Sequence, residues 1–296
     1  MAKSKKGVTP NQWSIIVVLI IVLGLASGFV GAKIGSGNGS GAGGAAGQEP
    51  GAFLEKIKAN GKLRIGIALA PPMTMQEDDG TYGGPNIIPL QNLAKDLGVE
   101  VEPVPAEWNN IVAGLQADRY DFAASLDQTI SRSMSISFTD SVWEYPGVFV
   151  VRADSKYTTA DDVLNNTDGK IATAQGTALE TTMKSLTKNT TSFKEYANSV
   201  SALNAKRVVG EFADYPAALA QVQADKNLKM IIPDTAIYQG KAAYGVPTDI
   251  DYRSLNVINV AIDRARNEND LDAAYKKVGY VPADDLPDTS PDLIKK

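Results

Sequence analysis

The residue types that most often carry out catalysis are scarce in this chain. Its 296 residues include no cysteine and no histidine, which excludes thiolate nucleophiles, cysteine-bound zinc and every Ser-His-Asp arrangement. Carboxylates and arginines are left, and Asp127 or Glu144 could act as a general acid only if it were removed from water. The sequence therefore predicts a protein that is not an enzyme and that needs neither a metal nor another cofactor.

The charged residues are distributed unevenly along the chain. There are 29 basic and 34 acidic side chains in all, and four of the lysines lie in residues 1–33, where there is no acid. The rest of the chain thus has 25 basic against 34 acidic side chains. An acidic body repels phosphate groups, so nucleic acid is not an expected partner.

The N-terminal region has the composition of a membrane segment. Residues 7–32 carry no charge, and residues 15–25 are almost entirely large and apolar. At about 1.5 Å per residue this stretch is long enough to cross a hydrocarbon core of about 30 Å. Trp13 suits the interface, and the lysines before it favour a cytoplasmic N-terminus. We predict a basic cytoplasmic end over 1–12 and a transmembrane or signal-anchor helix over 13–32, with the body outside the cytoplasm.

Two other interpretations of this region are open. The lysines and the small residues Val30-Gly31-Ala32 are also typical of a cleaved secretory signal. The stretch Lys5-Lys6-Gly7-Val8-Thr9-Pro10 resembles a prepilin-type signal cut after Gly7, as in archaeal pilins, although Gln12 stands where bacterial pilins have an acid. All three interpretations place the body at the cell surface or in the periplasm.

A linker follows the apolar segment. Residues 31–47 contain eight glycines among small and polar residues, and such a composition cannot bury enough apolar surface to become ordered. A flexible chain of this length reaches roughly 20–25 Å. We therefore predict a glycine-rich tether over 33–51.

Strand and helix patterns alternate through the body, and the alternation restarts near residue 147. Alternating apolar residues predict strands, and apolar residues at helical spacing predict helices. The predicted strands are 62–68, 99–104, 120–125, 147–152, 170–174, 211–213 and 228–232, and the predicted helices are 52–61, 87–97, 109–119, 159–164, 176–186, 199–208, 217–224 and 271–278. This order predicts a two-lobed α/β protein with parallel strands. Lobe 1 would span 52–146, lobe 2 with its crossover strands 147–245, and a return to lobe 1 with a C-terminal tail 246–296.

Four stretches of the body resemble the amino-acid-binding family of extracellular solute-binding proteins, bacterial family 3. They occur in the order and spacing of that family, over residues 61 to 278, and they are 61–67 with Pro71-Pro72, 108–121, 129–140, and 175–177 with 213–216. The resemblance implies the type II periplasmic-binding-protein fold, in which a small ligand is captured between two lobes. Strands near 147–151 and 244–248 would then form the hinge.

The resemblance also implies which residues contact the ligand. Arg132 falls where the family's arginine clamps a carboxylate, and Asp214 where its aspartate accepts from an α-ammonium. Trp108 matches an aromatic that stacks on the ligand. Gly176 and Thr177 match a loop whose backbone N–H groups receive a carboxylate. The plainer alternatives are a solvated loop charge for Arg132, helix caps for Asp214 and the Gly-Thr loop, and core packing for Trp108.

The departures from the family bear on specificity. Five residues before the arginine the family has Thr or Ser, whereas this chain has Asp127, which would repel a ligand carboxylate unless it were protonated or paired. Arg132 is the expected partner. Ser125 and Met73 complete the ligand-binding candidates. Further departures are Gly84-Pro85-Asn86 and Ala178. We hypothesise that the ligand is not a standard α-amino acid held in the usual way, or that binding has been lost.

Three function classes follow from these observations. The leading one is a membrane-tethered extracytoplasmic solute-binding protein that captures a small polar, amino-acid-like ligand for an ABC transporter permease or a receptor. The second is a filament or envelope subunit that assembles through its N-terminal helix and carries a binding-protein-like head. The third is a dehydratase-type enzyme on the same fold.

Overall fold

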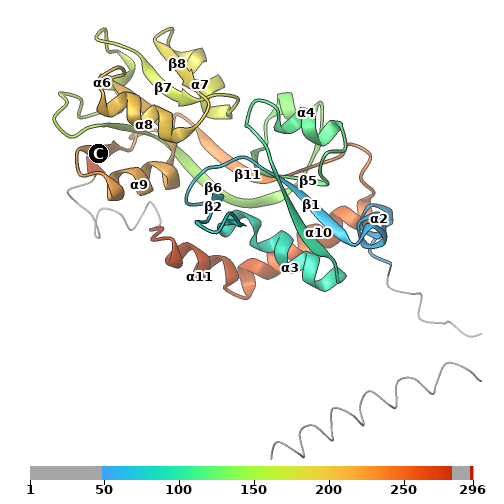
Figure 1. The fold of residues 1–296 in the computed structure, drawn as a ribbon. Coiled ribbons are helices and arrows are strands. Elements are labelled where there is room, and N and C mark those ends of the chain that lie inside the picture. The colour runs from blue at the N-terminus through green and yellow to red at the C-terminus, as the bar shows by residue number, and fades with distance from the viewer. Residues whose placement is uncertain (1–48, 282–293, 296) are drawn as a thin grey trace, which may run out of the picture. The chain divides into compact units, whose positions relative to one another are not determined.

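The structure is a computed structural model that describes residues 49–281 and 294–295 (Figure 1). The predicted cytoplasmic end, the apolar helix over 13–32, its cleavage sites and most of the tether lie outside the described residues. Within the described part of the chain, none of the helices combines the length and the apolar character needed to cross a membrane.

The first lobe is a parallel sheet with helices on both faces. Its elements are α2 (Ala52–Asn60), β1 (Lys62–Ile67), β2 (Met75–Gln76), β3 (Tyr82–Gly83), η1 (Pro85–Ile87), α3 (Ile88–Leu97), β4 (Glu100–Pro105), α4 (Ile111–Gln116), β5 (Phe122–Asp127), α5 (Ile130–Ser133), α10 (Tyr252–Asn267) and α11 (Asp270–Lys277). Strand β1 pairs in parallel with β4 on one side and with β5 on the other, as the strand and helix alternation predicts. Helices α2, α3, α10 and α11 form one core with β1 and β5, and α4 forms a second core on the opposite face.

The second lobe repeats this construction. Its elements are α6 (Ala160–Leu164), β7 (Ile171–Ala174), α7 (Ala178–Leu186), β8 (Thr190–Phe193), α8 (Tyr196–Asn204), β9 (Gly210–Asp214), α9 (Tyr215–Ala224) and β10 (Leu228–Ile231). Strand β7 pairs in parallel with β8 and β9. Helices α8 and α9 pack on one core of this lobe, and α6 and α7 pack on another.

Two strands run between the lobes (Figure 1). They are β6 (Ser137–Arg152) and β11 (Gln239–Val246). The first part of β6 pairs with β11, which in turn pairs with β5 of lobe 1. The last part of β6 pairs with β9 and β10 of lobe 2. A single long strand therefore belongs to both lobes.

The element boundaries differ from the sequence predictions at several places. Strand β6 begins at Ser137 instead of Gly147, and β8, α5 and the β2–β3 hairpin were not predicted. The long helix α10 was not predicted either, and its N-terminus is capped by the Asp251 side chain. Helices α10 and α11 pack on the core of lobe 1, and in the C-terminal tail β12 (Ile294–Lys295) pairs in parallel with β10 of lobe 2.

Candidate functional site

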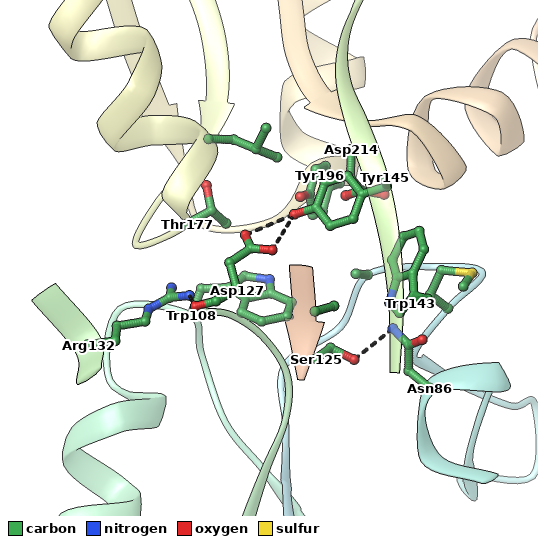
Figure 2. A pocket seen from close by; sticks show the side chains of 14 residues that line it. Asn86, Trp108, Ser125, Asp127, Arg132, Trp143, Tyr145, Thr177, Tyr196 and Asp214 are labelled. Carbon is green, nitrogen blue, oxygen red and sulfur yellow. Dashed lines mark hydrogen bonds between the residues drawn. The ribbon is translucent and has the colours of Figure 1, made fainter. Parts of the chain in front are cut away.

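A cavity lies where the two lobes meet, and both lobes line it (Figure 2). The centre of a water molecule can move within about 30 Å³ of it, whereas one water needs about 10–15 Å³. The cavity thus has room for a few waters or for a small ligand. It brings together seven of the eight predicted ligand-binding residues: Met73, Trp108, Ser125, Asp127, Arg132, Thr177 and Asp214. Their contact with a ligand stays a prediction, and Gly176 lies in the adjoining groove instead.

Asp127 is the buried acid of lobe 1 in this cavity. It ends β5 and is 6% exposed. The Tyr145 hydroxyl lies 2.8 Å from both of its carboxylate oxygens and donates to them (Figure 2), and the Tyr238 hydroxyl is a further partner. Burial raises the pKa of Asp127, and the hydrogen bond from Tyr145 and the nearby Arg132 charge oppose that rise.

Arg132 occupies the edge of the cavity and links the lobes. It lies in α5, where the Thr129 side chain accepts from its backbone N–H. Its Nη1 donates to the backbone carbonyl of Asp127 and its Nη2 to the carbonyl of Gly176, each at 3.0 Å. The expectation that Arg132 pairs with the Asp127 carboxylate is therefore wrong, because Tyr145 holds that carboxylate and the guanidinium bonds main-chain oxygens.

The loop before α7 approaches lobe 1 closely. Gly176 has a φ of +82°, and a Cβ atom there would lie 2.4 Å from the backbone nitrogen of Asn109, so only glycine fits. An ion pair from Lys194 to Glu107, at 3.0 Å, joins the same two lobes. We call this arrangement, with the lobes in contact around the cavity, the closed state.

The backbone donors of this loop are already engaged. The Gly176 N–H, expected to receive a ligand carboxylate, donates to Glu180 Oε2 at 2.7 Å. The Thr177 hydroxyl accepts from the Glu180 N–H at 3.1 Å and caps α7. The helix-cap interpretation of Thr177 is thus confirmed, and the expected carboxylate-binding role of Gly176 is already filled by a side chain of the protein.

Asp214 is the buried acid of lobe 2 in the cavity. It ends β9, and its Oδ1 accepts from the Ala217 N–H at 2.9 Å, which caps α9. The Tyr196 hydroxyl also donates to it. Burial is the main cause that raises the pKa of Asp214 to about 6, with a smaller contribution from the charge of Asp127. The cap interpretation is confirmed, and ligand contact stays a prediction.

Asn86 and Ser125 form a polar pair at another side of the cavity (Figure 2). The Asn86 Nδ2 donates to Ser125 Oγ at 2.8 Å, and Ser125 has a φ of +60°, a conformation that residues other than glycine rarely adopt. The Asn86 Oδ1 and the Trp143 Nε1 are buried and have no hydrogen-bond partner among the described residues. Such groups are satisfied by a ligand or by water.

Aromatic rings form much of the remaining wall. Trp143 and Tyr145 from β6 stack with centroids 4.7 Å apart, and Tyr196 and Trp108 complete the set. Trp108 packs against cores of both lobes, and its Nε1 donates to the Leu69 carbonyl at 3.3 Å. The sequence reasoning missed Trp143, Tyr145 and Tyr196, since no motif marks them, whereas it noted Asn86 as a departure from the family.

Glu144, the other acid considered for catalysis, does not line the cavity. Glu144 is exposed and forms an ion pair with Lys241 at 2.8 Å, so it is not the desolvated acid that catalysis would need. Across the part of the chain that the structure describes, no group of three or more acidic side chains is arranged to hold a metal ion.

Comparison with known proteins agrees with this architecture. The sequence model of the "Bacterial extracellular solute-binding proteins, family 3" matches residues 63–279. The L-cystine-binding protein TcyJ of Escherichia coli K12 is 39% identical over 69 residues, which are 23% of this chain and 26% of that protein. The cyclohexadienyl dehydratase of Pseudomonas aeruginosa is 32% identical over 73 residues, 24% of this chain and 27% of that protein. Both alignments thus span about a quarter of these curated relatives.

A solved structure shows the fold over a longer stretch. The solute receptor for L-cysteine of Neisseria gonorrhoeae superposes with a TM-score of 0.69 at 24% identity, and the match covers 77% of this chain and 93% of that one. The likeness confirms the predicted two-lobed α/β fold of the type II periplasmic binding proteins.

Proposed function

Because the chain belongs to the bacterial extracellular solute-binding proteins of family 3, we propose that it captures a small polar, amino-acid-like solute between its lobes. The observation that carries this proposal is the cavity itself, which is lined by Asp127 and Arg132 from lobe 1 and by Thr177 and Asp214 from lobe 2. A solute that contacts both lobes favours the closed state over the open one, since it gains those contacts only there. Strands β6 and β11 would bend as the lobes close.

A thermal screen tests capture. The full-length protein is heated with each standard amino acid, with L-cystine and with a set of small amines, each at a concentration far above the expected Kd. A ligand at about 100 times its Kd stabilises the folded protein by about 2.7 kcal/mol, which raises the Tm of a domain of this size by roughly 5–10 °C. X-ray scattering should show a smaller radius of gyration with the same solute. A screen in which no solute shifts the Tm would contradict the proposal.

We further propose that the body is held outside the cytoplasm by the apolar N-terminal segment and delivers its solute to an ABC transporter permease or to a receptor. The uncharged stretch over 7–32 and its preceding lysines support this. N-terminal sequencing of the mature protein separates the alternatives. Met1 or Ala2 would indicate an anchor, Lys33 a secreted protein, and Val8 a pilin-like subunit that self-assembles through its helix.

An enzymatic role is the second candidate, and one observation favours it. Asp127 is buried and its pKa is raised, which are properties of a general acid. The similarity to a dehydratase over 73 residues points the same way. Dehydratase turnover that is lost in Asp127→Asn while the Tm is kept would establish this role, and absence of turnover in the wild type would dismiss it.

A further inference from the structure

We infer that the interlobe cavity selects a small organic amine, a cation without an adjacent carboxylate, in preference to a zwitterionic α-amino acid. This inference rests on the proposed function and names the charge of its ligand. It follows from how the charged groups of the cavity are already paired, and from the groups that are left to meet a ligand.

Two carboxyl groups face the cavity from opposite lobes. Asp127 is 6% and Asp214 5% exposed, and each accepts a hydrogen bond from a tyrosine hydroxyl, Tyr145 and Tyr196 respectively. Neither carboxylate has a cation as its hydrogen-bond partner among the described residues. Two buried acids that share a cavity repel each other when both are ionised, and an ammonium between them would stabilise both.

The groups that would receive a carboxylate already make hydrogen bonds within the protein. Among the residues that line the cavity Arg132 is the only cation, and it donates to the main-chain carbonyls of Asp127 and Gly176. The Gly176 N–H is taken by Glu180. A ligand carboxylate near Arg132 would also lie near the Asp127 carboxylate, which repels it.

The uncharged lining also suits an amine. Four aromatic side chains line the cavity, namely Trp108, Trp143, Tyr145 and Tyr196, and the faces of such rings attract cations. The unpaired Asn86 Oδ1 is a buried acceptor for an ammonium or hydroxyl hydrogen, and the unpaired Trp143 Nε1 is a buried donor for a neutral oxygen. The small free volume of the closed state favours a small ligand.

Matched ligand pairs test the inference by isothermal titration of the full-length protein at pH 8. Ethanolamine is compared with L-serine, and ethylamine with L-alanine, so that each pair differs only in the carboxylate. We expect each amine to bind at least 10-fold more tightly than its amino acid. Asp127→Asn and Asp214→Asn should each weaken amine binding at least 10-fold. Asparagine is as good a helix cap as aspartate, so Asp214→Asn keeps α9 capped.

Two further variants complete the design. Asp154→Asn, which changes an exposed acid paired with Arg152, should leave amine affinity unchanged. Asp127→Ser restores the hydroxyl that the family has at this place, and it should shift the preference at least 10-fold toward L-serine.

The outcomes separate this inference from the proposed function. If either amino acid binds as tightly as its amine, or if both asparagine variants bind amines like the wild type, the inference is overturned while solute capture stands. If neither the amines nor any standard amino acid binds, both are overturned.

Discussion

Replacing Gly176 by alanine tests whether the closed state is the state that binds a solute. A Cβ atom at Gly176 would lie 2.4 Å from the backbone nitrogen of Asn109. Gly176 belongs to lobe 2 and Asn109 to lobe 1, so this clash exists only while the lobes are closed. The substitution therefore disfavours the closed state selectively, in addition to the backbone strain that it adds to every folded state.

The size of the effect follows from two contributions. An L-residue with a left-handed backbone is strained by about 1–2 kcal/mol, which lowers the stability of the open and closed states alike. Relief of the clash requires the lobes to separate, and this breaks the 3.0 Å hydrogen bond from Arg132 to the Gly176 carbonyl. A hydrogen bond from a charged donor contributes about 1.5–3 kcal/mol. We therefore expect ligand affinity to fall roughly 10-fold to 150-fold.

The assay compares titrations of the solute that gives the largest shift in the thermal screen. Gly61→Ala is the matched control, because Gly61 has a φ of +70° and nothing lies within 4 Å of an added Cβ. Both variants should lower the Tm by a similar amount through backbone strain. Only Gly176→Ala should lose affinity for the solute. At solute concentrations that saturate the wild type, only Gly176→Ala should keep a large radius of gyration.

A clear result would refute this reasoning. If Gly176→Ala binds within threefold of the wild type while both variants show the expected loss of Tm, then the contact between Gly176 and Asn109 is not part of the bound state. The ligand would then bind to an arrangement of the lobes other than the one described above.

Three further predictions concern the buried polar groups. Burial raises the pKa of Glu211 to about 8, above its usual value of 4.5. The folded state therefore holds a proton that the unfolded state releases, and the stability should fall as the pH rises from about 4.5 to 8. Melting curves of Glu211→Gln over this pH range should lose most of this decrease in Tm. Tyr145→Phe removes the hydroxyl that donates to the Asp127 carboxyl at 2.8 Å and should lower the free energy of unfolding by about 1–3 kcal/mol. In denaturant titrations, adding Asp127→Asn to this variant should recover part of the loss. Asp214→Ala removes the cap of α9 and should cost about 1 kcal/mol, whereas Asp214→Asn should keep the Tm and lose only ligand affinity.

The lobes could be predicted from the sequence because their strands and helices bury one face each. Strand β1 alternates Leu63, Ile65 and Ile67 toward one core, a period that is visible without a structure. The first part of β6 could not be predicted in this way. Residues 137–146 mix polar side chains with Pro146, and their extended conformation depends on pairing with β11, nearly a hundred residues later in the chain.

The candidate site also has a part that the sequence could predict and a part that depends on the tertiary fold. The resemblance to the family located Asp127 and Asp214, which end strands β5 and β9, and Arg132, which lies in the short helix α5 that follows β5. Their partners could not be predicted, because Tyr145 and Tyr196 come from β6 and α8 and reach the acids only through the tertiary fold. The charge pairing that the sequence suggested for Arg132 was wrong for the same reason, since the carbonyl of Gly176 becomes its partner only when the lobes meet.

Tyr145 connects the cavity to the strands that we propose as the hinge. It lies on β6 opposite Gly240 of β11, and a Cβ atom at Gly240 would come 2.3 Å from its ring, so the glycine makes room for the tyrosine. The ring packs in a core of lobe 2, whereas the hydroxyl bonds Asp127 of lobe 1. Any bending of β6 or β11 therefore changes the geometry of the Asp127 hydrogen bond. A solute that charges or neutralises Asp127 would in turn change the free energy of bending, and this is how binding and lobe closure would be coupled without a separate relay.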